Sequence, residues 1–122
     1  MTRQDRVRAL IAGWEARDLD AILANMTDDV AYENVGMGEM KGREAVRAAI
    51  GPFLAASEHV QWTVRHIAET ASGAVLTERV DEFRMGPRTL IIPVMGVFEF
   101  EGDLISAWRD YFDVPAFQRQ MA

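Results

Sequence analysis

A pair of oppositely charged residues, Arg79 and Asp81, lies in a stretch that alternates like a partly buried strand. Successive side chains of a strand point to opposite faces, so these two share a face with mostly apolar neighbours in residues 75–85. A charge among apolar neighbours costs several kcal/mol unless it is paired. The sequence therefore marks Arg79 and Asp81 as the first candidates for chemistry.

Two further places carry polar groups on faces that otherwise have the pattern of buried strands. Tyr32 and Asn34 are two residues apart and so share a face, and Asp110 falls between Trp108 and Phe112 by the same parity. Each has an ordinary structural alternative: an ion pair for the Arg–Asp pair, core filling for the Tyr and Asn, and a cap or an arginine partner for the lone Asp. Their coincidence in one small chain favours a catalytic site.

Together, these five polar groups have the chemistry needed to activate water. Two carboxylates that flank one guanidinium can hold different protonation states, one as a base and the other as an acid. The hydroxyl of Tyr32 and the amide of Asn34 can hold the water by two further hydrogen bonds. His59 and His66 lack metal-ligand spacing with acidic residues and the chain has no cysteine, so we expect neither metal nor cofactor.

Size and charge narrow the class of protein. The 122 residues fit one domain with one core, and we expect this domain to span residues 1–122. A net charge of -6 argues against nucleic-acid and anionic-membrane partners, which would need a basic patch. No apolar run approaches the ~18 residues of a membrane span and no N-terminal apolar leader is evident, so we expect a cytoplasmic protein.

Three helices are predicted in the first half of the chain. Thr2 is a suitable N-cap for the first, and its apolar residues recur at the spacing of one helix face. That face carries Val7, Leu10, Ile11 and Trp14. Asp18 caps a short second helix over residues 19–25, and Pro52 should kink or end the third, over residues 43–55. The glycine-rich residues 36–42 are predicted to form a flexible lid or turn.

Five segments have strand patterns: residues 30–34, 60–69, 75–85, 90–100 and 104–112. Tight turns are predicted between the last four, at Ser72-Gly73, Gly86-Pro87 and Glu101-Gly102-Asp103. Alternation in residues 60–69 predicts one face made of Val60, Trp62, Val64, His66 and Ala68. Pro93 cannot donate to a neighbouring strand, which indicates an edge or a bulge at that point.

This order of elements, helices with one short strand followed by four strands, is typical of the α+β class. We expect a curved antiparallel or mixed sheet that wraps around the N-terminal helices. Such an arrangement encloses a cone-shaped pocket between the sheet and the helices. No further element is predicted after residue 112.

Three motifs also resemble a known family. They are Tyr32-Glu33-Asn34, Glu78-Arg79-Val80-Asp81 and Trp108-Arg109-Asp110-Tyr111-Phe112-Asp113. In this order, and with matching strand context, they resemble the signature of the limonene-1,2-epoxide hydrolase family. The resemblance runs from the first helix to about Phe117. It implies the nuclear-transport-factor-2-like, or SnoaL-like, cone fold (a cystatin-like α+β roll) and a homodimer.

The resemblance also implies a role for each polar residue. Asp110 would be the base that acts on water, and Tyr32 and Asn34 would fix that water. Asp81 would be the acid that protonates the epoxide oxygen, and Arg79 would bridge the two carboxylates.

The predicted function is therefore a cofactor-independent epoxide hydrolase that adds water to a small apolar epoxide, cyclic or terpene-like, to give a vicinal diol. Its apolar pocket is predicted to be lined by Phe83, Ile92, Val94, Trp108 and Phe117. One alternative is a ketosteroid-isomerase-like or polyketide-cyclase-like enzyme of the same fold, in which an Asp moves a proton on a ketone. Another is a non-catalytic binding or dimerisation module.

Overall fold

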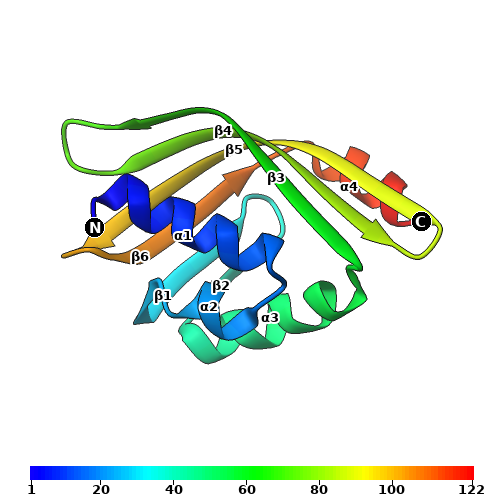
Figure 1. Ribbon diagram of the computed structural model, residues 1–122, viewed down its shortest axis with the longest axis horizontal. Coiled ribbons are helices and arrows are strands. Elements are labelled where there is room, and N and C mark those ends of the chain that lie inside the picture. Colours follow the sequence, from blue (N-terminus) through cyan, green and yellow to red (C-terminus); the bar gives the residue numbers. More distant parts are fainter.

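Residues 1–122 are described by a computed structural model, in which a mixed sheet bends around helices (Figure 1). In chain order, its elements are α1 (Arg3–Glu15), α2 (Leu19–Leu23), β1 (Met26–Asn34), β2 (Glu39–Lys41), α3 (Arg43–Ala56), β3 (His59–Glu69), β4 (Val75–Met85), β5 (Arg88–Glu101), β6 (Leu104–Tyr111) and α4 (Val114–Met121). None of the helices is long and apolar enough to cross a membrane.

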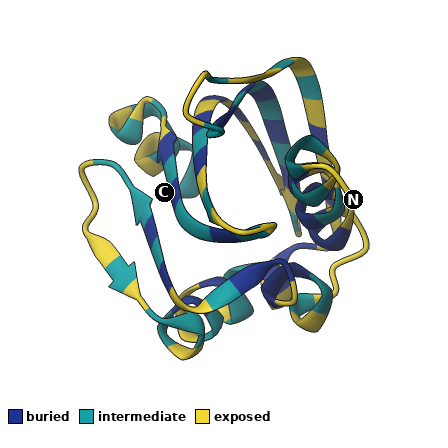
Figure 2. Cartoon of the chain, turned by 90° about the vertical axis from the view of Figure 1, so that its left-hand side faces the viewer, coloured by how far each residue is buried: buried dark blue, intermediate teal, exposed yellow.

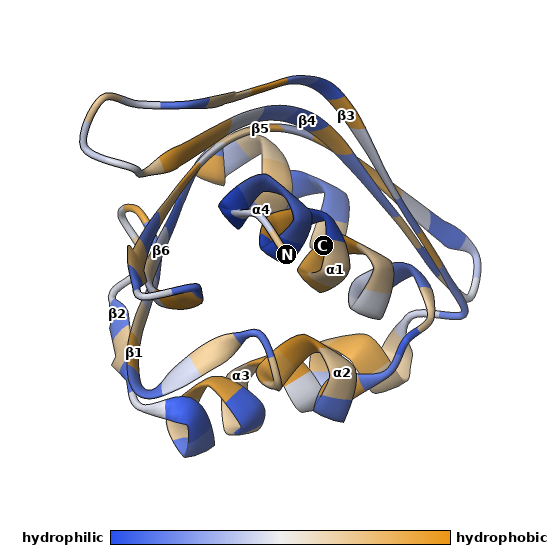
Figure 3. Ribbon diagram, turned by 60° about the vertical axis from the view of Figure 1, so that its left-hand side comes forward, coloured by the Kyte–Doolittle hydropathy of each residue, from blue (hydrophilic) through white to orange (hydrophobic).

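The sheet has six strands in the order β2-β1-β6-β5-β4-β3. All neighbours are antiparallel except β1 and β6, which run parallel. The sheet curls around α1, while α2 and α3 lie across the open side of the curve (Figure 3). This arrangement confirms the predicted α+β class with a curved, mixed sheet around the N-terminal helices.

The first helix begins where the sequence predicts. The Thr2 hydroxyl accepts a hydrogen bond from the Asp5 backbone N–H, and the Asp5 carboxylate accepts one from the Thr2 backbone N–H. This capping box satisfies two donors that the helix itself leaves free. The predicted apolar face of α1 is buried, and its Trp14 stacks on Trp62 of β3. The second helix is capped by Asp18 as predicted, but it ends at Leu23, two residues earlier than predicted.

Two element boundaries and two additional elements are the main differences from the sequence prediction. Strand β1 begins at Met26, because an irregularity between Met26 and Ala31 keeps the two exposed aspartates 28 and 29 within the strand. The short strand β2 lies inside the predicted loop and pairs with β1. Helix α3 continues past the exposed Pro52 to Ala56. Helix α4 has no counterpart in the prediction; Asp113 caps it, and a proline occupies its first turn.

The face predicted for β3 is wrong beyond Val64. The pairing of β3 with β4 shifts between Val64 and His66, and the shift turns His66 and Ala68 outward and Ile67 inward. Pro93 lies at a local edge of the sheet, as expected. Strand β5 pairs with β6 only from Met95 onward, so the half of β5 that contains Pro93 has a single strand neighbour, β4.

The core fills the space between the concave face of the sheet and the helices. It contains 22 buried hydrophobic residues in one cluster. Buried and exposed residues alternate along the strands (Figure 2), as expected for a sheet with one covered face. Within this apolar layer lie six buried polar or charged residues: Asn25, Ser57, Thr77, Arg79, Asp81 and Asp110.

Candidate active site

Arg79 and Asp81 form a two-point ion pair on the inner face of β4. The Arg79 Nε–H donates to Asp81 Oδ1 at 3.1 Å, and Nη2 donates to Asp81 Oδ2 at 2.9 Å. Arg79 is 1% exposed and Asp81 is 4% exposed. The alternation along residues 75–85 correctly placed both side chains on the buried face. The fork of the guanidinium matches the two oxygens of a carboxylate, which fixes the relative orientation of the pair.

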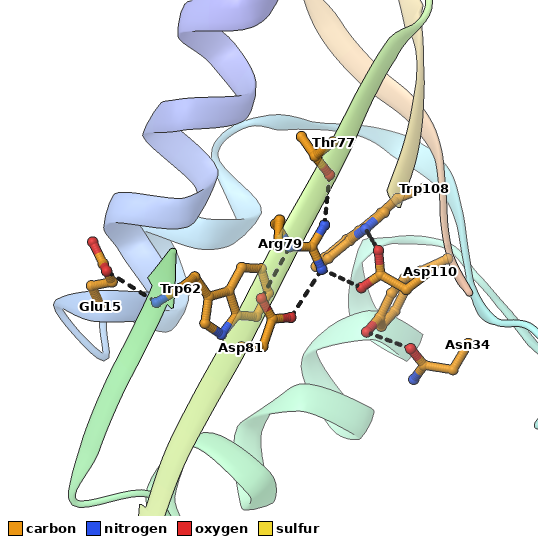
Figure 4. Close-up of polar contacts among 9 residues, drawn as sticks. Glu15, Asn34, Trp62, Thr77, Arg79, Asp81, Trp108 and Asp110 are labelled. Carbon is orange, nitrogen blue, oxygen red and sulfur yellow. Dashed lines mark hydrogen bonds and ion pairs between the residues drawn. The ribbon is translucent and has the colours of Figure 1, made fainter. Parts of the chain in front are cut away.

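Arg79 also contacts Asp110, which comes from β6. Its Nη2 lies 2.9 Å from Asp110 Oδ2, and its Nη1 donates to Thr77 Oγ1 at 3.0 Å. The ring of Trp62 lies 4.6 Å from the guanidinium carbon and covers one face of it. Figure 4 shows the guanidinium between the two carboxylates, each held by its own contact. The structure thus brings the three predicted charged residues into one buried cluster.

One guanidinium faces two carboxylates, and this imbalance shapes their ionisation. Burial raises the pKa of Asp81 to about 6, although Arg79 acts in the opposite direction. Burial alone would lower the pKa of Arg79, but the charges of Asp110 and Asp81 raise it above its usual value, so the guanidinium stays charged. Asp81 is therefore the group in the cluster that gains and loses a proton near neutral pH.

The parallel pairing of β1 and β6 brings the other predicted residues to the cluster. Tyr32 is the cross-strand partner of Trp108, and Asn34 is the cross-strand partner of Asp110. The Tyr32 hydroxyl donates to Asn34 Oδ1 at 3.2 Å. Burial and the charge of Asp110 both raise the pKa of Tyr32, so the hydroxyl stays neutral. A hydroxyl and an amide therefore lie beside the Asp110 carboxylate.

Trp108 differs in position from the prediction. We expected it to line the pocket, but it is fully buried behind the pocket wall, and it is not among the residues that line the cavity. Its Nε1–H donates to Asp110 Oδ1 at 2.8 Å (Figure 4). The parity of the strand placed Trp108 and Asp110 on the same face, but it did not distinguish a wall residue from a partner of the carboxylate.

An apolar cavity of about 210 Å³ opens beside the cluster. Of its 16 lining residues 13 are hydrophobic, and the three others are Asn34, Asp81 and Asp110. Four residues predicted for the wall are there: Phe83, Ile92, Val94 and Phe117. The sequence did not assign Trp14, Met37, Met40, Ala49, Ile50, Phe53, Trp62 and Phe112 to the wall. Their apolar periodicity predicted burial for several of them but held no signal of which cavity they would share.

Helix α4 closes one side of this cavity. It contributes Phe117 to the wall, and Phe117 packs edge-on against Phe112. Gln120 anchors the helix to the edge of β5 that has no β6 partner. Its Oε1 accepts from the Ile91 backbone N–H at 2.8 Å, and its Nε2 donates to the Ile91 carbonyl at 3.1 Å. The side-chain amide thus takes the place of a missing neighbouring strand.

Comparisons with known proteins agree with this geometry. The family model of the limonene-1,2-epoxide hydrolase catalytic domain matches residues 2–122. The epoxide hydrolase EphG of Mycobacterium tuberculosis is 35% identical over 109 residues, which cover 88% of this chain and 71% of EphG.

Two solved structures are similar to this chain, one in sequence and fold and the other in fold alone. The structure of an LEH-like epoxide hydrolase of M. tuberculosis superposes with a TM-score of 0.82 at 31% identity, covering 95% of this chain and 86% of that one. A SnoaL-like polyketide cyclase from Shewanella denitrificans superposes at 0.86 with 12% identity, over 98% of this chain and 96% of the other, and shows the shared fold alone. The chain belongs to the limonene-1,2-epoxide hydrolase family.

Proposed function

We propose that this protein is an epoxide hydrolase that works without a cofactor and adds water directly to an epoxide to give a vicinal diol. The observation that carries the proposal is the buried bridge of Arg79 between Asp81 and Asp110 at the wall of an apolar cavity. Such a bridge holds an acid and a base at fixed positions on the two sides of one charge.

In the proposed reaction, Asp110 takes a proton from a water molecule while the oxygen of that water attacks an epoxide carbon. The carbon–oxygen bond of the ring breaks, and protonated Asp81 gives its proton to the epoxide oxygen. The raised pKa of Asp81, about 6, suits a proton donor near neutral pH. The reaction leaves the proton on Asp110 and Asp81 ionised, and exchange with solvent restores the starting state.

Tyr32 and Asn34 are proposed to hold the water. The Tyr32 proton is donated to Asn34 Oδ1, which leaves the hydroxyl oxygen as an acceptor for the water and the Asn34 amide NH2 as a donor to it. A water held this way keeps one hydrogen for Asp110 and a lone pair for the epoxide carbon. Positioning of this kind supplies much of the rate enhancement when two reactants must meet.

The cavity favours a small apolar substrate. Its volume of about 210 Å³ lies below the ~300–1,000 Å³ common for ligand pockets, and its polar groups gather at the charged cluster. A compact cyclic or terpene-like epoxide of the limonene 1,2-epoxide type would place its three-membered ring at the carboxylates and its hydrocarbon part against the wall. We also propose a homodimer, because Ile91, Met95 and Tyr111 are exposed on the outer face of the sheet.

Incubation of purified protein with a panel of small cyclic and terpene epoxides tests the function. We expect diol formation by the wild type and its loss in Asp110→Asn, with the control Glu82→Gln unaffected. Glu82 is a neighbouring carboxylate on the opposite face of β4 from the cluster. Inactivity of the folded wild type across the whole panel would contradict the proposal. Light scattering of the same preparation measures the oligomeric state.

A further inference from the structure

The three tryptophans differ in how their ring nitrogens are satisfied. The indole nitrogens of Trp14 and Trp62 are buried and have no hydrogen-bond partner. Only Trp108 has one, because its Nε1–H donates to Asp110 Oδ1 at 2.8 Å. A buried donor aimed at a buried carboxylate is a strong, charge-assisted contact.

Trp108 is also held from both sides. Its ring stacks on Tyr32 with centroids 4.3 Å apart and planes 26° apart, and on Phe98 with centroids 5.5 Å apart and planes 22° apart. The side chain is 0% exposed, so the ring has no room to rotate. The direction of its N–H is therefore fixed by packing and does not depend on Asp110.

We propose that Trp108 is a positioning residue for the base, an inference that rests on the role proposed above for Asp110. Trp108 fixes Oδ1 of Asp110 and Arg79 fixes Oδ2, so the carboxylate cannot turn about its bond to the chain. Asp110 lines the cavity together with Tyr32 and Asn34, so its remaining lone pairs are available to a water held by these two residues. Because Tyr32 stacks on the same indole, one ring sets the geometry of both the base and the water-holding hydroxyl.

The N–H has an electrostatic effect as well as a geometric one. A hydrogen bond donated to an ionised carboxylate stabilises the charged form, which is the form that acts as a base. The other charged or titratable groups that face Asp110 are Arg79 and Asp81 from β4 and Tyr32 from β1. A substitution of Trp108 leaves the chemical identity of these groups unchanged, and one that keeps the fused rings also keeps the stacking on Tyr32 and so measures the effect of the N–H alone.

The first experiment is Trp108→Phe, which keeps an aromatic ring and removes the N–H. We expect kcat to fall about tenfold to a hundredfold with little change in KM, since the substrate does not contact Trp108. The acidic limb of the pH dependence of kcat/KM should move to higher pH, because the ionised form of the base has lost a donor. A purely structural role for Trp108 would lower stability and leave this limb in place.

Ile22→Val is the control, because Ile22 is a fully buried core residue of α2 that neither lines the cavity nor belongs to the charged cluster. It should lower the melting temperature while turnover per folded molecule and the pH profile stay as in the wild type. Asp110→Asn separates the two proposals. If it is active, the role of Asp110 fails; if it is inactive while Trp108→Phe has wild-type turnover and an unmoved acidic limb, only the inference on Trp108 fails.

A spectroscopic measurement on the unmodified chain gives an independent test. The indole N–H of Trp108 should resonate downfield of that of Trp14 and shift with pH at the same midpoint as the acidic limb of kcat/KM. Should Trp108→Phe yield only unfolded protein, 3-benzothienylalanine at position 108 keeps the fused rings and lacks the N–H, and the same losses are expected. An indole signal insensitive to pH across the acidic limb would overturn the inference.

Discussion

Gly96 is the cross-strand partner of Asp110, and the space where its side chain would stand is filled by the charged cluster. A Cβ atom at this position would lie 2.9 Å from Asp110 Oδ1 and 2.8 Å from Thr77 Oγ1, and nearer still to Arg79 Nη1. Thr77 pairs with Gly96 from the other side, in β4. Strand β5 therefore needs a glycine here to let a guanidinium lie across it, and not to reach an unusual backbone conformation.

Gly96→Ala should displace the Arg79 guanidinium and separate it from Asp110. We expect a loss of turnover of at least about tenfold, with a destabilisation of about 1–3 kcal/mol from overpacking. Gly51→Ala in α3 is the matched control, because its new methyl group would meet only Leu19 Cδ2, at an ordinary 3.6 Å. Steady-state kinetics and thermal unfolding of the two variants measure both effects. Wild-type turnover in Gly96→Ala would mean that the cluster tolerates the displacement.

Labelling with oxygen-18 distinguishes direct attack by water from a covalent intermediate. If water attacks the epoxide carbon directly, a single turnover in oxygen-18 water should place the label in the diol at once. Mass spectrometry of the peptides that contain Asp81 and Asp110 should then find no label in the protein. Label in either carboxylate would reveal a covalent ester intermediate and overturn direct attack.

Asp81→Asn and Asp110→Asn separate catalysis from structure. Each variant removes one proton transfer and should lower kcat by ~10²–10⁴, and the double variant should cost little more than either single one. Removing one partner from a purely structural buried cluster would instead destabilise the fold by about 3–5 kcal/mol. Turnover and melting temperature measured on the same preparations distinguish the two. Turnover per folded molecule that stays normal would contradict the catalytic roles.

The pH dependence should follow Asp81. With its pKa raised to about 6, the acid is protonated below this value and loses its proton above it. We expect kcat/KM to fall about tenfold for each pH unit on the alkaline side. A rate that stays level to about pH 8 would exclude Asp81 as the acid.

The same raised pKa makes stability depend on pH. The stabilisation from the Asp81 proton is complete below the usual pKa of 3.8 and is lost as the pH rises through about 6. Asp81→Asn lacks this dependence. Between pH 3.8 and about pH 6 the free energy of unfolding of the wild type should therefore fall by about 3 kcal/mol relative to that of Asp81→Asn. Urea unfolding of both proteins at several pH values measures the difference.

Gln120→Ala should loosen the wall of the cavity without touching the cluster. The substitution removes both contacts with the backbone of Ile91, so α4 and Phe117 are held less firmly. We expect KM for an apolar epoxide to rise several-fold and kcat to change less. Gln118→Ala on the exposed side of the same helix is the control and should leave both constants unchanged. Equal KM values in the two variants would show that α4 does not depend on this anchor.

Local periodicity was sufficient for part of the site. The period of two along β4 placed Arg79 and Asp81 on the buried face, since that rule needs only the strand itself. The contact between Asn34 and Asp110 follows from a parallel pairing of strands far apart in the chain, and no local pattern specifies such a pairing. The outward turn of His66 has a similar cause, because a single shift in pairing reverses the faces of the residues that follow.

Helix α4 and the position of Trp108 were missed for different reasons. The helix is only eight residues long, and it was missed although its N-cap Asp113, the proline in its first turn and its amphipathic pattern are all visible in the sequence. Trp108 was correctly predicted to face inward, but a large aromatic residue beside a carboxylate has the same pattern whether it contacts the substrate or the carboxylate. Only the 2.8 Å contact with Asp110 decides between the two.

The place of β6 between β1 and β5 has a consequence for the newly made chain. Every other strand precedes β6 in the sequence, yet β6 joins the β1–β2 pair to the β3–β4–β5 meander. Until β6 leaves the ribosome, the nascent chain has two separate pieces of sheet with open edges, which are prone to pair with other chains. Tyr32 and Asn34 are thus synthesised well before Asp110, and the buried cluster is complete only after β6 has paired with both pieces of the sheet.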